Sequence, residues 1–251
     1  KNIEFSGGLY EEDVLKKLKK LQKKQNILIH NYFPRPKKDF VLNLASANKF
    51  ILKKTEAFIK KSILLCSKLN IKYYSFHAGF LIDPNVEELG KRVEKRNLFP
   101  KEKAIALFIE RINEIAEYAK NFEIEILIEN NVISENNFLK FDSNPFLMAD
   151  KNDCIEVMNK TSSNVNLLID VAHLKVSSQS LNFSKEIFLK ECDPWIKAYH
   201  FSDNDGKHDS NESMTDNSWF WPYIKKGLDY YSIEVYNSDI KILIEQLNLV
   251  K

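Results

Sequence analysis

The 251-residue chain is poor in cysteine and glycine, and its charges nearly cancel. Its three cysteines, Cys66, Cys154 and Cys192, stand far apart and form no Cys-x-x-Cys pair. This spacing argues against a disulfide framework and against a thiolate zinc site, and it is typical of a reducing compartment. We therefore expect a cytoplasmic protein.

Long apolar runs are missing as well. No run approaches the roughly 20 residues that a membrane-spanning helix needs, and no signal peptide is visible. The six glycines form no cluster, whereas an open doubly wound sheet usually carries a glycine-rich phosphate loop. The net charge of +2 names no partner by itself. We therefore expect no membrane partner, and an open sheet is only the second choice of fold.

What the sequence does contain is a regular alternation of two patterns. Short apolar runs bounded by polar residues are typical of buried parallel strands, and apolar residues every three to four positions are typical of helices. Strands are predicted at 2–5, 27–30, 72–77, 125–129, 166–170, 197–201 and 231–235. Helices are predicted at 10–25, 48–69, 101–121, 150–163, 184–192 and 238–250. Such alternation predicts βα units around a parallel sheet.

Chain length and loop lengths indicate which α/β fold this is. About 250 residues are typical of one TIM barrel, and no linker or internal repeat divides the chain. The connections after strands are long and those after helices are short, as in a barrel whose βα loops build the active site. We predict a single TIM (β/α)8 barrel domain over residues 1–251. Seven strands are visible, so the first strand is expected upstream of residue 1.

Imidazoles and carboxylates stand at the ends of these strands. Those at or just beyond a strand end are His30, His77, Glu129, Asp170, His173, His200 and Glu234. Any one of them alone would more often be a structural residue. Buried strands tolerate charge poorly without a partner, so seven such residues at equivalent positions favour a shared site at the mouth of a barrel.

Four of these residues form a donor set for a divalent metal. Glu129, Asp170, His200 and Glu234 offer three carboxylates and one imidazole from four strands. Such an oxygen-rich set suits Mn²⁺, Mg²⁺, Co²⁺ or Fe²⁺, and it suits zinc when more imidazoles join. The other histidines would be available for a second ion or for substrate hydroxyls.

Several short motifs carry a resemblance to a known family. They are His30-Asn31-Tyr32, His77-Ala78-Gly79, Leu127-Ile128-Glu129-Asn130, Asp170-Val171-Ala172-His173, His200-Phe201-Ser202-Asp203 and Ile233-Glu234-Val235. With these motifs in this order, essentially the whole chain resembles the xylose-isomerase-like TIM barrels. That group includes sugar isomerases and epimerases and, more distantly, endonuclease IV.

The resemblance implies roles for the strand-end residues. In the isomerase branch, the residues that match Glu129, Asp170, His200 and Glu234 hold one metal, and the two glutamates flank the sugar carbon whose proton moves. The residue that matches His173 contacts substrate. In the endonuclease branch, the residues that match His30 and His77 also bind metal, within a multinuclear zinc site.

The loop after His200 departs from the endonuclease pattern, which continues there with Asp-x-His. One register makes His208 that histidine and puts Gly206 in place of the aspartate. The other register keeps Asp209 as the aspartate, puts Asn211 in place of the histidine and needs no gap. We prefer the second, in which His208 is an exposed loop residue and Asp209 is a candidate for a second metal or for substrate.

Other polar and aromatic residues have two open interpretations each. Trp219 and Trp221 could pack on sugar C–H groups or form a hydrophobic lid. Asn130 could orient Glu129, bind a hydroxyl or serve simple turn chemistry. Arg35, Lys37 and Lys38 could touch a phosphate backbone, and a solvated loop explains them equally well.

The function expected from this pattern is a metal-dependent sugar or sugar-phosphate isomerase or epimerase of carbohydrate metabolism. Glu129 and Glu234 would transfer the proton through a metal-stabilised ene-diolate. The alternative is a phosphodiesterase of the endonuclease IV type, with two or three ions. The low net charge counts against a nucleic-acid substrate. The oligomeric state is not indicated by the sequence.

Overall fold

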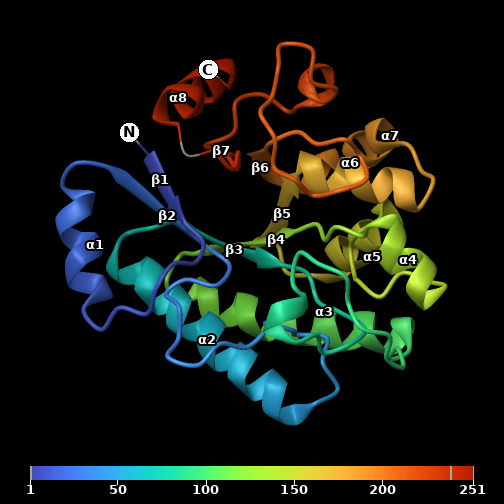
Figure 1. Cartoon of the computed structure of the whole chain (residues 1–251). Coiled ribbons are helices and arrows are strands. Elements are labelled where there is room, and N and C mark those ends of the chain that lie inside the picture. The colour runs from blue at the N-terminus through green and yellow to red at the C-terminus, as the bar shows by residue number, and fades with distance from the viewer. Residues whose placement is uncertain (1, 238, 251) are drawn as a thin grey trace. The chain divides into compact units, whose positions relative to one another are not determined.

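The computed structural model describes residues 2–237 and 239–250 (Figure 1). Seven parallel strands are hydrogen-bonded in sequence order from β1 to β7, and helices alternate with them as in a TIM-type α/β barrel. All seven expected strands are present. An eighth strand upstream of residue 1 stays a prediction. In the described part of the chain, no helix combines the length and the apolar character that a membrane span requires.

The chain forms two compact units. Unit 1 comprises residues 1–128 and 160–166, and unit 2 comprises residues 129–159 and 167–251. The single domain expected over residues 1–251 stays a prediction.

Unit 1 holds the first strands and the long helices that cover them. The strands are β1 (Asn2–Phe5), β2 (Asn26–His30), β3 (Tyr73–His77) and most of β4 (Glu125–Glu129), and the helices are α1 (Val14–Gln22), α2 (Lys49–Lys68) and α3 (Lys101–Lys120), with a 3-10 turn at Val86–Glu88. The buried residues of α2 and α3 recur every three to four positions, and the two helices pack on each other. That spacing is the apolar stripe from which the sequence predicted them.

Unit 2 holds the last strands and shorter helices. The strands are β5 (Val165–Asp170, which begins in unit 1), β6 (Ile196–Phe201) and β7 (Tyr230–Ile233). The helices are α4 (Glu135–Phe141), α5 (Lys151–Lys160, which ends in unit 1), α6 (Val171–Ser180), α7 (Lys185–Cys192) and α8 (Ile240–Leu249), with 3-10 turns at Asp193–Trp195 and Trp221–Tyr223. In the parallel register Asp170 lies beside His200, and His200 lies beside Ser232. The strand-end polar residues of β5 and β6 therefore share one level of the sheet.

Two helices of unit 2 were not predicted. α6 begins directly after β5, so no loop separates the strand from the helix, and all but three of its ten residues are buried. A helix buried on nearly every side lacks the polar face that reveals a helix in a sequence. α4 is only seven residues long and is too short to show a period.

Several predicted ends were also wrong. α1 begins at Val14 rather than at residue 10, because residues 10–13 form an irregular turn. β7 ends at Ile233, although Glu234 continues the ladder by donating its N–H to the carbonyl of Phe201 at 2.9 Å. The last helix was expected from Ser238, which lies outside the described residues; the described helix begins at Ile240.

Candidate metal centre

Unit 2 brings together the four residues of the predicted donor set. Glu129 ends β4, Asp170 ends β5, His200 lies next to the end of β6, and Glu234 follows β7. One ligand atom from each lies within 4.8 Å of those of the other three. The side chains of Glu129 and Asp170 are completely buried, whereas 26% of the Glu234 side chain is exposed. The cluster is therefore closed at its base and open on the side of Glu234.

The imidazole of His200 lies between the two glutamates. Its Nδ1 is 2.9 Å from Oε2 of Glu234 and 3.3 Å from Oε1 of Glu129. Two carboxylate oxygens thus lie close to one ring nitrogen. This nitrogen and the carboxylate oxygens converge as the ligands of a single ion would.

Asp170 has two different roles in this cluster. Its Oδ1 accepts the N–H of His173 at 2.7 Å and thereby caps the N-terminus of α6. Its Oδ2 is buried and has no hydrogen-bond partner among the described residues. Burial, together with the negative charges of Glu234, Glu129 and Asp209, raises the pKa of Asp170 to about 7, against the opposing effect of His173. A buried carboxylate oxygen of this kind requires a cation or a proton.

His173 extends the cluster toward the loop after β6. Its Nδ1 is 3.0 Å from the carbonyl of Asn130, and its Nε2 is 3.2 Å from Oδ2 of Asp209. Burial lowers the pKa of this imidazole, but Asp170, Asp209 and Glu129 outweigh that effect and raise it well above its ordinary value. His173 and Asp209 thus lie together beside the four-residue set. Their role in binding a second ion or a substrate stays a prediction.

The loop geometry agrees with the preferred register of the sequence motif. Asp209 reaches His173, whereas His208 is exposed and pairs with Asp205 at 3.0 Å. Asn211 is buried, and its side-chain oxygen accepts a hydrogen bond from Ser202 at 3.3 Å. Asn211 therefore stands in the interior, where the endonuclease pattern has its histidine.

Asn130 has a structural role that the sequence did not reveal. Its Oδ1 accepts the N–H of Asp170 at 2.8 Å, and its Nδ2 donates to the carbonyl of Asp170 at 3.2 Å. Its own carbonyl accepts from His173. One residue thus fixes the backbone of Asp170 and the ring of His173. A contact of Asn130 with a ligand stays a prediction.

A partly buried ion pair braces the loop that carries Asp209. Lys175 on α6 donates to Oδ1 of Asp203 at 2.6 Å and also to the carbonyl of Asn204. The other oxygen of Asp203 accepts from Ser218 at 2.8 Å. These contacts of Lys175 and Asp203 were not predicted from the sequence. The polar residues 202–205 after β6 were a signal that side chains hold this loop.

The two tryptophans pack away from His200. Successive side chains of a strand point to opposite faces, so Phe201 faces the side of β6 that His200 does not. Phe220 and Trp221 pack on Phe201, with ring centroids 5.4 and 5.5 Å away. Trp219 lies under the ammonium of Lys185, at 4.9 Å. This packing gives no support to a role of Trp219 or Trp221 in binding a sugar, which stays a prediction.

The remaining two candidate histidines belong to unit 1. The rings of His30 and His77 meet edge to face with centroids 5.6 Å apart, and Nδ1 of His30 is 2.9 Å from Oγ of Ser75. They pair with each other, as residues at the ends of adjacent strands should. Their role as ligands stays a prediction.

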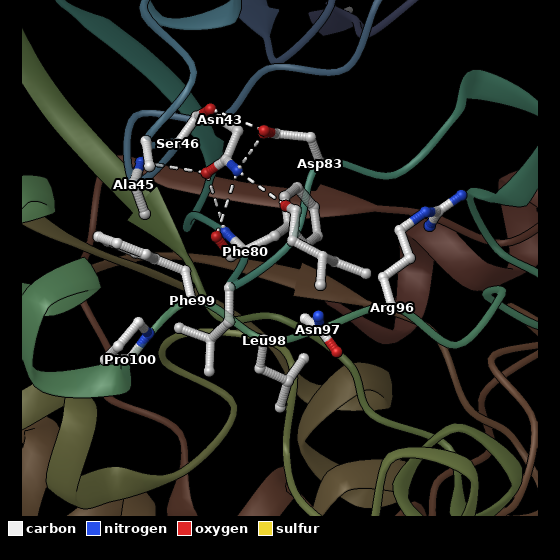
Figure 2. Close-up of a pocket in the computed structure, with 13 residues that line it drawn as sticks. Asn43, Ala45, Ser46, Phe80, Asp83, Arg96, Asn97, Leu98, Phe99 and Pro100 are labelled. Carbon is white, nitrogen blue, oxygen red and sulfur yellow. Dashed lines mark hydrogen bonds between the residues drawn. The ribbon is translucent and has the colours of Figure 1, made fainter.

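Unit 1 also has a pocket of about 320 Å³ between the loops that follow β2 and β3 (Figure 2). Asn43 lies at its edge and holds the two loops together: its Nδ2 donates to the carbonyl of Ile82 and to Asp83, both at 2.9 Å. Its Oδ1 accepts from the backbone of Ala45 and Phe80 at 3.0 Å each. The side-chain amide of Asn43 therefore connects the two loops at the edge of the pocket.

The donor set fits a divalent ion. Three carboxylates and one imidazole converge, and buried Oδ2 of Asp170 lacks a hydrogen-bond donor among the described residues. A cation is the group that would compensate so many buried negative charges. Glu129, Asp170, His200 and Glu234 are the residues that would hold it.

Comparisons with known proteins agree with this fold. A solved D-tagatose 3-epimerase-like protein superposes with a TM-score of 0.71 at 18% identity, over 96% of this chain and 82% of that one. An L-ribulose 3-epimerase superposes with a TM-score of 0.63 at 15% identity, over 98% and 75%. At such identities the likeness concerns the fold.

A sequence relative lies in the other branch. A probable endonuclease 4 of Thermotoga petrophila is 30% identical over 89 residues, and this match spans 36% of the present chain and 30% of that relative. The model of the xylose isomerase-like TIM barrel family covers much more, since it matches residues 2–234. The chain therefore belongs to the xylose isomerase-like TIM barrel family.

Proposed function

We propose that this protein is a divalent-metal-dependent isomerase or epimerase of a sugar or sugar phosphate. The observation that carries the proposal is the convergence of Glu129, Asp170, His200 and Glu234 within 4.8 Å. The names of two proteins of similar fold, a D-tagatose 3-epimerase-like protein and an L-ribulose 3-epimerase, support the same class of reaction.

The two glutamates are proposed to move the proton. They approach Nδ1 of His200 at 3.3 and 2.9 Å and come from different strands, so each can face a different side of a substrate carbon. One carboxylate removes the proton beside the carbonyl, and the other returns it. When bound, the ion supplies a Lewis acid that polarises the carbonyl and stabilises the negative charge developing on it.

The neighbouring residues would orient and shield the reaction. His173 donates from Nδ1 to the carbonyl of Asn130, which leaves Nε2 and its partner Asp209 to face a hydroxyl of the substrate. Glu129 is buried, so water is kept from its carboxylate, whereas Glu234 is partly exposed and can exchange its proton with solvent.

Two measurements test the proposal. Elemental analysis of the purified protein should give about one Mn, Co, Mg or Fe per chain. Incubation of the metal-loaded protein with keto sugars in D₂O should place deuterium on the carbon beside the carbonyl, detected by NMR. An ion-loaded protein that exchanges no proton in any keto sugar or keto-sugar phosphate would contradict it.

A phosphodiesterase of the endonuclease type is the second candidate. The pairing of His173 with Asp209 and the adjacent rings of His30 and His77 favour it, since these residues exceed the needs of a single ion. The partial match to a probable endonuclease 4 supports the same class. Two or three zinc or iron ions per chain and cleavage of abasic DNA would establish this candidate instead.

A further inference from the structure

The net charge of the whole chain is small, but the two units carry large net charges of opposite sign. Unit 1 contains 26 Lys and Arg and 16 Asp and Glu, a net charge of +10. Unit 2 contains 11 Lys and Arg and 19 Asp and Glu, a net charge of −8. The net charge of +2 therefore does not describe the electrostatic field at each surface, because a field depends on where the charges lie.

Part of the excess in unit 1 gathers in one surface, which we name the basic patch. It consists of residues 9–10, 37–38 and 49–54. Contacts join these segments: Lys37 lies 5.2 Å above the ring of Tyr10, and Lys54 lies 4.4 Å from the ring of Phe50. Lys54 also lies 5.7 Å from Phe40, next to the second segment.

The basic patch exposes large apolar side chains among its lysines. The exposed fraction is 82% for Leu9, 66% for Phe50 and 42% for Tyr10. Single exposed apolar residues are ordinary, but three within one cationic surface form a combination suited to an interface. Leu9 and Tyr10 lie in the segment between β1 and α1, and Phe50 lies in the first turn of α2. All three side chains are therefore exposed on the surface.

The lysines of the patch are available for an outside partner. Lys38, Lys49 and Lys53 are exposed, and none of them forms an ion pair within residues 2–237 and 239–250. The nearby carboxylate of Asp39 is occupied by Arg35, to which it is bound through two oxygens. A negatively charged surface would therefore meet uncompensated cations.

We propose that the basic patch docks this protein on the surface of an anionic lipid bilayer. Lysine clusters are attracted to anionic headgroups, and apolar side chains between them enter the boundary of the acyl chains. This proposal departs from the sequence prediction of no membrane partner, which was made because no segment can span a bilayer, since peripheral docking needs no spanning segment. The proposal does not depend on the proposed catalytic function.

The composition of the patch favours a bilayer over a nucleic acid. Arg35 could form a bidentate hydrogen bond with a phosphate, but it is already bound to Asp39 and to the carbonyl of Gly8. Leu9 is aliphatic and cannot stack on a base, and one face of Phe50 is covered by Lys54. Insertion into lipid uses all three apolar side chains.

Co-sedimentation with vesicles tests the proposal in the full chain. Binding is expected to vesicles of 70% phosphatidylcholine and 30% phosphatidylserine, and not to pure phosphatidylcholine. The double variant Lys38→Gln, Lys53→Gln should bind about 25-fold more weakly, at about fivefold for each lysine. Among the described residues, neither lysine packs on an aromatic ring, so the fold should be kept.

Two further variants separate charge from apolar insertion. Lys190→Gln with Lys226→Gln removes the same charge from exposed positions of unit 2 and should leave binding unchanged. Leu9→Ser with Phe50→Ser keeps the charge and should weaken binding about tenfold or more. Absence of binding to anionic vesicles, or an equal loss in the unit 2 variant, would overturn the proposal. So would binding of a single-stranded oligonucleotide without binding of vesicles.

Discussion

The two units differ in net charge and in where their ionisable side chains lie. Unit 2 is acidic overall and buries carboxylates in its interior, around the imidazoles of His173 and His200. Unit 1 is basic overall, keeps its lysines on the surface and pairs His30 with His77 through their rings. Exposed cations cost little in free energy, whereas buried carboxylates cost several kcal/mol each unless a cation compensates them.

Hydrogen bonds hold the backbone around the buried carboxylates of unit 2. In unit 2, Asn130 binds the backbone of Asp170 through both its amide oxygen and its amide nitrogen. Ser177 on α6 accepts the N–H of Ile133 at 3.1 Å and donates to the carbonyl of Asn131, so it holds the loop after β4. Such support is what a preorganised ligand set requires. We infer that unit 2 alone can hold one ion.

The largest effect is expected from Glu129→Gln. The change keeps the shape of the side chain but removes a buried ligand charge, so the ion should be lost and turnover should fall about 10²–10⁴-fold. Metal content by elemental analysis and proton exchange in D₂O would measure both.

The matched variant in unit 1 is His77→Asn. It should keep one ion per chain and most of the activity if unit 2 alone provides the ligands. Loss of metal from His77→Asn would show that unit 2 alone does not hold the ion and would favour the multinuclear alternative. Unchanged metal and turnover in Glu129→Gln would refute the assignment of Glu129.

A second effect concerns stability and pH. The pKa of Asp170 is raised to about 7, mainly by burial, from an ordinary value of 3.8. Between these values the unfolded chain ionises while the folded chain keeps the proton. The ion-free protein should therefore lose stability as pH rises through this window, by up to about 1.4 kcal/mol per pH unit.

Asp170→Asn should abolish this loss, because asparagine is neutral and still caps α6. Without metal, the variant should equal the wild type near pH 4 and exceed it at pH 8. Asp209 and Glu129 remain beside His173, whose pKa loses the contribution of Asp170. Urea unfolding in EDTA would measure this, with exposed Asp216→Asn as the control, which should change stability by no more than about 0.5 kcal/mol. A constant difference from pH 4 to 8 would contradict the raised pKa.

The strands and the grouping of the four strand-end residues could be predicted because their signals are local. An apolar run that ends in Glu129 or in Asp170 is visible in the sequence, and parallel strands bring such ends together by geometry alone. All seven strands and the grouping of Glu129, Asp170, His200 and Glu234 follow from that one rule.

The parts that could not be predicted depend on contacts between distant segments. The amide of Asn130 binds a backbone 40 positions away, and Lys175 on α6 binds Asp203 in the loop after β6. Trp221 packs on Phe201 of β6, which lies far from it in the sequence. The division of charge likewise appears only when the units are known.

The smallest effect, and the sharpest test of preorganisation in unit 2, is expected from Asn130→Asp. The variant keeps the oxygen that accepts from the N–H of Asp170 but replaces the donor to its carbonyl by a second oxygen. That oxygen repels the carbonyl and should shift Asp170 without removing any ligand. Metal affinity should fall about 10–100-fold, as for the loss of a residue that supports a ligand.

Asn131→Asp is the matched control for this change. Asn131 is also buried, and its amide donates to the carbonyl of Leu147 at 2.9 Å rather than to Asp170. Both variants should lose stability, but only Asn130→Asp should lose metal affinity, measured by calorimetric titration with Mn²⁺. Equal losses of affinity would mean that Asn130 supports the fold in general. A selective loss would show that the buried acids of unit 2 function because their backbone is fixed, which the surface cations of unit 1 do not require.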